Sequence, residues 1–224
     1  MLTQTAVAGT PNVDRQFNVT RKAEMAEGVQ LGVARGFERN AEIYAEGEDS
    51  GYVYKIISGV VRVCKLLPDG RRQITAFHMP GEMFGLEADD IHRTSAEAVV
   101  PTKVIAYRWE GVVETERQPA NFVRELLSQT VRGLRQNQDH LLLLGRKNAL
   151  ERLAAFLLEM DPPSGSKHVL NLAMPRHDIA DYLGLTIETV SRMFAELKDM
   201  GTIELESSRR VHILDMAKLR AMST

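Results

Sequence analysis

Residues Arg176–Leu205, with the sequence RHDIADYLGLTIETVSRMFAELKDMGTIEL, contain the pattern that decides the fold. Gly184 separates two short amphipathic segments, Thr186 suits the N-cap of the second, and Gly201 suits the position just after its end. The apolar residues at helical spacing are Ile179, Ala180, Leu183, Val190, Met193, Phe194 and Leu197. Two short helices joined by a tight turn that contains glycine are typical of a helix-turn-helix unit.

The second helix of this unit would present polar side chains near its N-terminus. In a DNA-binding helix-turn-helix, these positions face the major groove. Glutamate can accept a hydrogen bond from cytosine N4, and arginine can bind guanine O6 and N7 through two hydrogen bonds. We therefore expect base contacts from Glu188, Ser191 and Arg192, and contacts to the DNA backbone from Thr186 and Thr189.

The segment that follows has the pattern of a β-hairpin. Two short apolar stretches, 203–205 and 210–213, flank a polar tip that carries Arg209 and Arg210. A winged helix places such a hairpin against the phosphates, where both arginines would supply affinity that is independent of sequence. An αα-hairpin with solvated charges and no role in DNA binding is the alternative, and the added hairpin favours DNA binding.

Short apolar stretches separated by turn residues fill residues 41–109. Pro68, Asp69 and Gly70 lie between two stretches of strand composition and predict a hairpin turn. Residues 103–109 alternate apolar and polar side chains, as the last strand of the set. Closely spaced short strands of this kind predict a β-sandwich or a β-barrel.

Apolar side chains change to helical spacing between about Glu114 and Arg146. No proline interrupts residues 121–160, and a helix of about 25 residues is roughly 37 Å long, which is more than one small β-domain can cover. We therefore favour a dimer contact over packing on the chain's own β-domain. The expected dimer seam consists of Leu127, Val131, Leu134, Gln138 and Leu141.

Composition excludes several classes of protein. The 224 residues carry 28 Lys+Arg and 30 Asp+Glu, so the net charge gives no support for a nucleic-acid partner. A prediction of DNA binding therefore has to rest on where individual charged residues lie. The single cysteine, Cys64, excludes an internal disulfide, an all-cysteine iron–sulfur cluster and a cysteine-rich zinc site. No apolar stretch approaches the roughly 18 residues of a membrane span and no signal peptide is present, so we expect a cytoplasmic protein with no membrane partner.

No catalytic motif emerges from the sequence. It has no phosphate-binding loop, no serine-hydrolase elbow and no zinc-protease motif. His177 and Asp178 are neighbours on an expected helix, and neighbours at i and i+1 are not expected to face each other. We therefore expect no enzyme, no catalytic residue and no metal site.

The chain resembles the CRP/FNR superfamily of bacterial transcription regulators over nearly its whole length. The resemblance is carried by GVVRV at 59–63, by PGEMFG at 80–85, by the long helix and by 188–192, which matches the E-x-x-S-R recognition helix of the FNR-type branch. Residues 178–192 are especially similar to FixK-type regulators. The resemblance implies an α+β fold with an N-terminal cyclic-nucleotide-binding-like β-roll, a long dimerisation helix and a C-terminal winged helix-turn-helix.

Residues 1–24 are polar and rich in small residues, which predicts an N-terminal arm. With the resemblance, the expected division continues with a sensor-like β-roll at 25–115, the dimerisation helix at 116–146 and the winged-helix DNA-binding domain at 147–224. The same resemblance implies partners. A homodimer would bind a near-palindrome of double-stranded DNA of the form TTGAT-N4-ATCAA and activate transcription by contacting RNA polymerase. The loop at 161–168 is a candidate for that contact, and low-oxygen respiration or nitrogen fixation is the expected setting.

Members of this superfamily that bind cyclic AMP hold it with a Gly-Glu-Leu segment and an Arg-Ser pair. In this sequence Leu86 stands where that glutamate would be, and Thr94 stands where that arginine would be. Three acidic residues add negative charge where the phosphate would lie: Glu87, Asp89 and Asp90. Arg93 is near enough in the sequence to compensate part of this charge. Cyclic-nucleotide binding is therefore not favoured.

Other effectors have little support in the sequence. Cys64 lies in a predicted strand and is expected to pack as a small apolar side chain. Isolated histidines are more often packed side chains than haem ligands, and no spacing pairs His78, His92 or His140. FixK-type regulators are generally controlled through their own synthesis, so we expect DNA binding with no cofactor. The alternative is a ligand-switched sensor whose β-roll binds a small molecule or haem.

Overall fold

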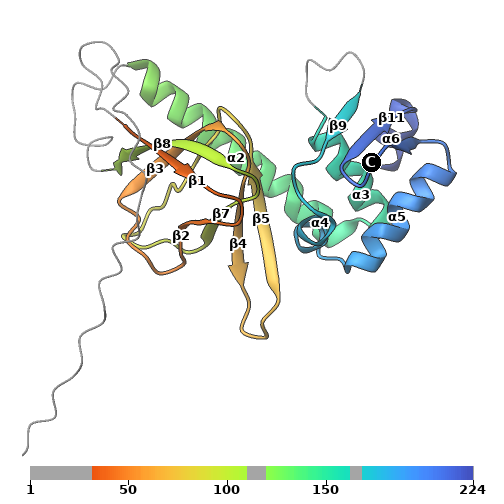
Figure 1. The fold of residues 1–224 in the computed structure, drawn as a ribbon, viewed down its shortest axis with the longest axis horizontal. Coiled ribbons are helices and arrows are strands. Elements are labelled where there is room, and N and C mark those ends of the chain that lie inside the picture. The colour runs from red at the N-terminus through yellow and green to blue at the C-terminus, as the bar shows by residue number, and fades with distance from the viewer. Residues whose placement is uncertain (1–31, 110–119, 162–167, 224) are drawn as a thin grey trace, which may run out of the picture.

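The structure, a computed structural model, describes residues 32–109, 120–161 and 168–223. These residues form a β-roll, a long helix and a smaller C-terminal part of helices and short strands (Figure 1). The N-terminal arm expected at 1–24, the first residues of the expected long helix and most of the loop at 161–168 lie outside the described residues. The described elements confirm the α+β fold class with its β-roll and C-terminal helix-turn-helix.

The β-roll consists of two four-stranded antiparallel sheets that face each other across an apolar core. Alternate side chains of its strands point into this core; in β8, for example, Val104 and Ala106 are buried and Lys103 is exposed. One sheet has the order β1 (Val33–Phe37), β8 (Thr102–Arg108), β3 (Tyr52–Ser58) and β6 (Met83–Phe84). The other has the order β2 (Glu42–Tyr44), β7 (Ser95–Ala98), β4 (Val61–Leu66) and β5 (Arg72–His78).

The predicted hairpin turn at residues 68–70 is confirmed. Strands β4 and β5 pair antiparallel and are joined at Leu67, whose N–H donates to the Arg71 carbonyl at 2.8 Å. Gly70 has φ +83°, a left-handed conformation that glycine adopts without a steric cost. The resulting β4–β5 hairpin projects from the body of the β-roll on the side of the C-terminal part (Figure 1).

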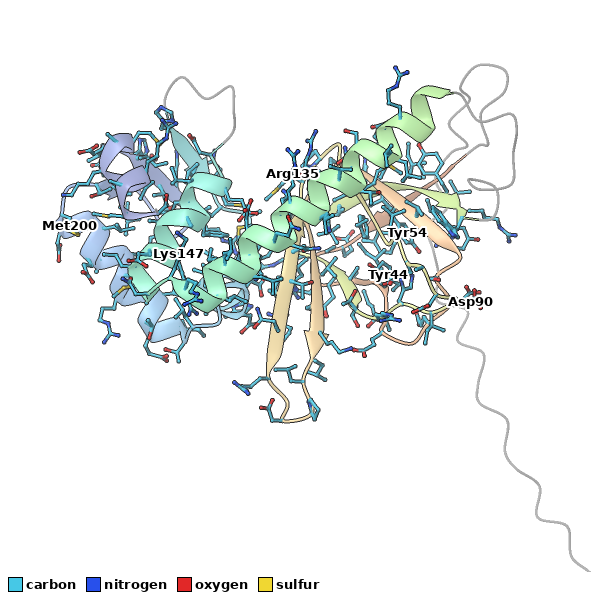
Figure 2. All side chains as sticks on the ribbon, turned by 180° about the vertical axis from the view of Figure 1, so that it is seen from behind. Tyr44, Tyr54, Asp90, Arg135, Lys147 and Met200 are labelled. Carbon is cyan, nitrogen blue, oxygen red and sulfur yellow. The ribbon has the colours of Figure 1, made fainter. Side chains whose placement is uncertain are left out.

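The long helix α2 spans Ala120–Arg146 and crosses the β-roll to Lys147, where the C-terminal part begins (Figure 2). An ion pair between Lys55 Nζ and Glu125 Oε1 at 2.6 Å holds it to β3. Near its C-terminal end Leu143 is buried against α3 and the core of the C-terminal part. The apolar side chains of the expected seam are instead exposed: Leu127 63%, Val131 44%, Leu134 59% and Leu141 70%.

The C-terminal part begins with a well-capped helix. Asn148 accepts hydrogen bonds from the N–H groups of Leu150 and Glu151, and the Glu151 carboxylate accepts from the Asn148 N–H. The antiparallel sheet of the C-terminal part has the order β10, β11, β9. Phe156, Phe194 and Leu197 lie in the core of this part. The elements are α3 (Ala149–Glu159), β9 (Val169–Asn171), α4 (Arg176–Leu183), α5 (Ile187–Asp199), β10 (Ile203–Leu205), β11 (Arg210–Ile213) and α6 (Met216–Met222).

Candidate DNA-binding interface

Helices α4 and α5 form the predicted helix-turn-helix. Helix α4 ends at Gly184 in the left-handed conformation, with φ +62°. A side chain at Gly184 would be strained in this conformation, and its Cβ would lie 3.3 Å from a Leu144 methyl group. Thr186 caps α5 by accepting a hydrogen bond from the Thr189 N–H at 3.2 Å, so the expected cap is confirmed. The turn thereby determines where α5 starts and which of its faces is solvent-exposed.

One face of α5 is buried and the other is free to contact a partner. Val190, Met193, Phe194 and Leu197 are buried, so the side chains between them point to solvent. The three expected base-contacting residues, Glu188, Ser191 and Arg192, are all exposed and lie on this free face near the N-terminus. Hydrogen bonds from its own backbone and from Thr186 lower the pKa of Glu188, which keeps this side chain a carboxylate acceptor at neutral pH.

Ile187 is a surface residue that sequence reasoning missed. It is the first residue of α5, and 47% of it is exposed although isoleucine favours burial. The apolar periodicity carried no signal for this exposure, because Ile187 lies three residues before Val190, which is the spacing of a buried position. The exposed face of α5 therefore combines the Glu188 carboxylate, the Arg192 guanidinium, the Ser191 hydroxyl and the apolar side chain of Ile187.

Strands β10 and β11 form the expected hairpin, with Ile203 opposite Ile213 and Leu205 opposite Val211. The two arginines of its tip differ in their partners. Arg210 Nε lies 3.1 Å from the Glu206 carboxylate, and both side chains are about half exposed. Within the described residues, the Arg209 side chain has no ion pair, so its guanidinium can meet a phosphate without first losing a carboxylate.

A buried ion cluster joins the helix-turn-helix to the β-roll. Arg62 of β4 contacts Asp178 of α4 at 2.8 Å and Glu97 of β7 at 2.5 Å, and Asp178 is fully buried. Arg72 of β5 contacts Asp178 at 2.5 Å and Asp181 at 2.8 Å. Two arginines and three carboxylates from four elements therefore connect the two parts of the chain.

The expectation that His177 and Asp178 do not face each other was wrong. His177 Nε2 lies 3.1 Å from Asp178 Oδ1. Both residues lie in the first turn of α4, and the long imidazole side chain reaches back over a carboxylate that points toward the β-roll. The contact belongs to the ion cluster, in which Asp178 is already held by two arginines.

Comparison with known proteins identifies the two parts. Residues 151–222 match the Crp-like helix-turn-helix domain, and residues 34–114 match the cyclic nucleotide-binding domain. The nitrogen fixation regulation protein FixK of Azorhizobium caulinodans is 42% identical over 222 residues, covering 91% of this chain and 90% of that protein. FixK of Rhizobium meliloti is 42% identical over 186 residues, covering 83% of this chain and 85% of that protein.

The chain belongs to the CRP/FNR superfamily. The structure of FixK2 from Bradyrhizobium japonicum agrees, with a TM-score of 0.81 and 41% identity over 87% of this chain and 98% of that one. The FixK-like branch expected from residues 178–192 is confirmed by these relatives. The chain is thus a DNA-binding transcription regulator of the CRP/FNR superfamily, whose members are not enzymes.

The cavity of the β-roll differs from a site for an anionic ligand. It has a volume of about 420 Å³ and lies between strand β5, helix α2 and the C-terminal part, which contributes Tyr182. Two carboxylates, Glu87 and Glu159, line it, and among the described residues of its wall none is lysine or arginine. Leu86 and Thr94, the two departures from the cyclic-AMP pattern, both lie in this wall.

Arg93 does not supply the missing cation. Its guanidinium pairs with the Asp89 carboxylate, both side chains are exposed, and neither belongs to the described wall of the cavity. A phosphate in the cavity would therefore lie near two carboxylates without a compensating cation, which is electrostatically unfavourable. The part of the chain that matches the cyclic nucleotide-binding domain thus has two carboxylates in the wall of its cavity.

Cys64 packs as a buried side chain, as expected, and it belongs to the core cluster that β4 and β5 share with the C-terminal part. It is buried in β4, and desolvation raises the pKa of its thiol to about 11, so it is neither a thiolate nor an exposed sensor at neutral pH. Among the described residues, no three histidine, cysteine, aspartate or glutamate side chains are arranged to hold a metal ion. No helix in the described part of the chain is long and apolar enough to span a membrane.

Proposed function

We propose that this chain is a homodimeric transcription activator that binds a TTGAT-N4-ATCAA-like palindrome without a bound effector. The observation that carries the proposal is the exposed face of α5, where Glu188, Ser191 and Arg192 lie together on a helix whose other face is buried. A helix of this form fits the major groove, and its N-terminal side chains meet the base edges.

Each side chain of this face has a chemical role in the proposed contact. The Glu188 carboxylate accepts from cytosine N4, Arg192 donates to guanine O6 and N7, and Ser191 hydrogen-bonds a base. Ile187 adds apolar contact with a thymine methyl group, and the proposed half-site offers two adjacent thymines. Thr186, Thr189, Arg209 and Arg210 contact phosphates on either side of these bases.

The exposed row on α2 supports a homodimer. Leu127, Val131, Leu134 and Leu141 follow one another at intervals of four, three and seven residues, and Gln138 completes the row. An apolar row of this length on one helix has the spacing of a two-helix seam, and burying it against a second copy removes it from water. A two-fold dimer matches a two-fold symmetric site, which is why we propose a palindrome.

Effector-free binding is supported by the acidic cavity wall and by the buried ion cluster. The cluster consists of side chains of the chain itself and fastens α4 to the β-roll, so the helix-turn-helix has a defined orientation. The activity of relatives named as nitrogen fixation regulators points to genes of nitrogen fixation or oxygen-limited respiration, with RNA polymerase as the second partner. The cytoplasm is the compartment in which DNA and RNA polymerase are available.

A direct binding experiment tests this proposal. Ligand-free protein is titrated into a fluorescent TTGAT-N4-ATCAA duplex and into a scrambled duplex of the same composition, at one salt concentration. We expect tight and selective binding with two chains per duplex, because both half-sites are read by α5. Equal and weak binding to both duplexes would contradict the effector-free proposal.

Arg192→Ala is expected to weaken binding by about 1–3 kcal/mol for each half-site and to relax specificity at the contacted base pair. The reason is the loss of two hydrogen bonds to a base edge. Lys198→Ala is the matched control, since it removes a cation from the last turn of the same helix. Competition with single-base variants of the duplex measures the change. An equal loss on all duplexes would show that Arg192 binds a phosphate instead of a base.

The cavity supports a second candidate, a regulator switched by a small molecule. Its volume of about 420 Å³ suits a small ligand, and Tyr182 of α4 shares its wall with the β-roll. A ligand there would touch the helix-turn-helix through α4. If ligand-free protein fails the binding experiment, cyclic nucleotides and haem are the first compounds to add, and restored selective binding would establish this alternative.

A further inference from the structure

The β4–β5 hairpin belongs to the β-roll, but its base is fixed against the helix-turn-helix. Arg72 pairs with Asp181 of α4 at 2.8 Å, and the Gln73 amide donates to the carbonyl of Tyr182 at 3.3 Å. Arg72 also contacts the fully buried Asp178. These contacts give the tip of the hairpin a defined position beside the turn between α4 and α5.

A hollow of about 440 Å³ lies between this tip and the start of α5. Leu67 and Arg71 line it from the hairpin, and Leu185, Thr186 and Thr189 line it from the helix-turn-helix. Thr186, the N-cap of α5, and Thr189 of its first turn are both proposed to contact DNA phosphates. The hollow is therefore continuous with the proposed DNA-binding face, and DNA bound to α5 has its backbone at this edge.

The charges around the hollow suit a phosphate. The Arg71 side chain is 78% exposed, and its partner, Asp69, is also exposed. Such exposed pairs contribute little to stability, so the guanidinium can turn from Asp69 to a phosphate at little cost. Arg72 balances Asp181 at the base of the hollow, and the N-terminus of α5 adds partial positive charge.

We propose that Arg71 contacts the DNA sugar–phosphate backbone beside α5, so that the β-roll contributes directly to DNA affinity. The proposal rests on the DNA-binding function proposed above and adds to it a contact from outside the C-terminal part. Arg71 contributes affinity and positioning without reading a base, because a phosphate carries no sequence information.

The test compares three variants in the duplex titration, repeated over a range of salt concentrations. Each phosphate contact contributes about 0.9 to the slope of log K against log salt, so Arg71→Ala should reduce the slope of a dimer by about 2. It should weaken binding to cognate and scrambled duplexes by the same factor. Asp69→Asn should strengthen binding to both, since it removes a carboxylate near the phosphate and keeps the acceptor for the Arg71 N–H.

Arg93→Ala is the matched control. Arg93 is also an exposed arginine of the β-roll, with 72% of its side chain accessible and an aspartate partner, but it does not line the hollow. For the Arg93→Ala variant, the slope of log K against log salt should equal that of the unmodified chain. If Arg71→Ala and Arg93→Ala have the same slope, the proposal is wrong. If the unmodified chain itself shows no selective binding, the proposed function fails first, so the two failures are distinguishable.

Discussion

Replacing Leu134 and Leu141 together by aspartate is expected to separate the dimer and to lower the affinity for the palindrome by about a hundredfold or more. Both side chains are more than half exposed in the single chain, so the fold of one protomer loses little by the change. Four carboxylates would meet in the seam of the dimer, where each loses its hydration without gaining a partner. Each half-site would then be bound by a separate protomer, and the affinity gained when two linked protomers bind one duplex would be lost.

Sedimentation measures the state of association, and the duplex titration measures the affinity. The control is the double replacement of Leu134 and Leu141 by methionine, which keeps an apolar side chain of similar volume and should leave the dimer intact. Circular dichroism checks that both variants keep their helices. A double aspartate variant that remained dimeric would show that α2 does not form the interface.

Arg62→Ala is expected to lower the free energy of unfolding by about 3–5 kcal/mol. Arg62 is 5% exposed and pairs with Asp178, which is fully buried, and with Glu97. Removing the guanidinium leaves part of the Asp178 carboxylate without a donor in a place that water does not reach. The cost is the desolvation of that carboxylate, and it exceeds the benefit that the intact ion pair provides over an apolar contact.

Urea unfolding followed by circular dichroism measures this loss. Arg93→Ala, at an exposed ion pair, is the control and should leave the free energy of unfolding nearly unchanged. The double variant Arg62→Met, Asp178→Leu should recover most of the stability, because it removes both buried charges and keeps apolar volume. A loss for Arg62→Ala as small as that of the control would mean that water or a rearranged Arg72 satisfies Asp178.

The helix-turn-helix could be predicted because its signals are local. Thr186 caps α5 by accepting a hydrogen bond from the N–H three residues later, and Gly184 ends α4 through its left-handed backbone conformation. The buried stripe of α5 repeats within one helix, so the exposed positions of Glu188, Ser191 and Arg192 follow from it. The same holds for the β4–β5 hairpin, whose turn residues lie next to each other in the sequence.

The missed features have a common origin in how the elements pack against one another and how their side chains turn. The exposure of Ile187 depends on which parts of α5 are covered by α4 and β10, and the spacing of apolar residues in the sequence does not predict this. The side chain of His177 meets Asp178 because α4 turns that carboxylate toward the β-roll. Arg209 and Arg210 are both arginines of the same turn, and only the folded hairpin shows that the Glu206 carboxylate contacts Arg210 and His212.

The sequence by itself determined the helix-turn-helix with its hairpin, the solvent-exposed side of α5 and the membership in the CRP/FNR superfamily. Capping, turn geometry and helical spacing act over a few residues, so they can be followed along the chain. Tertiary structure alone decided the buried contact between Arg62 and Asp178, which are 116 residues apart, and the hollow between Arg71 and α5. Such pairs depend on how three elements pack together, and neither partner carries a local sign of the other.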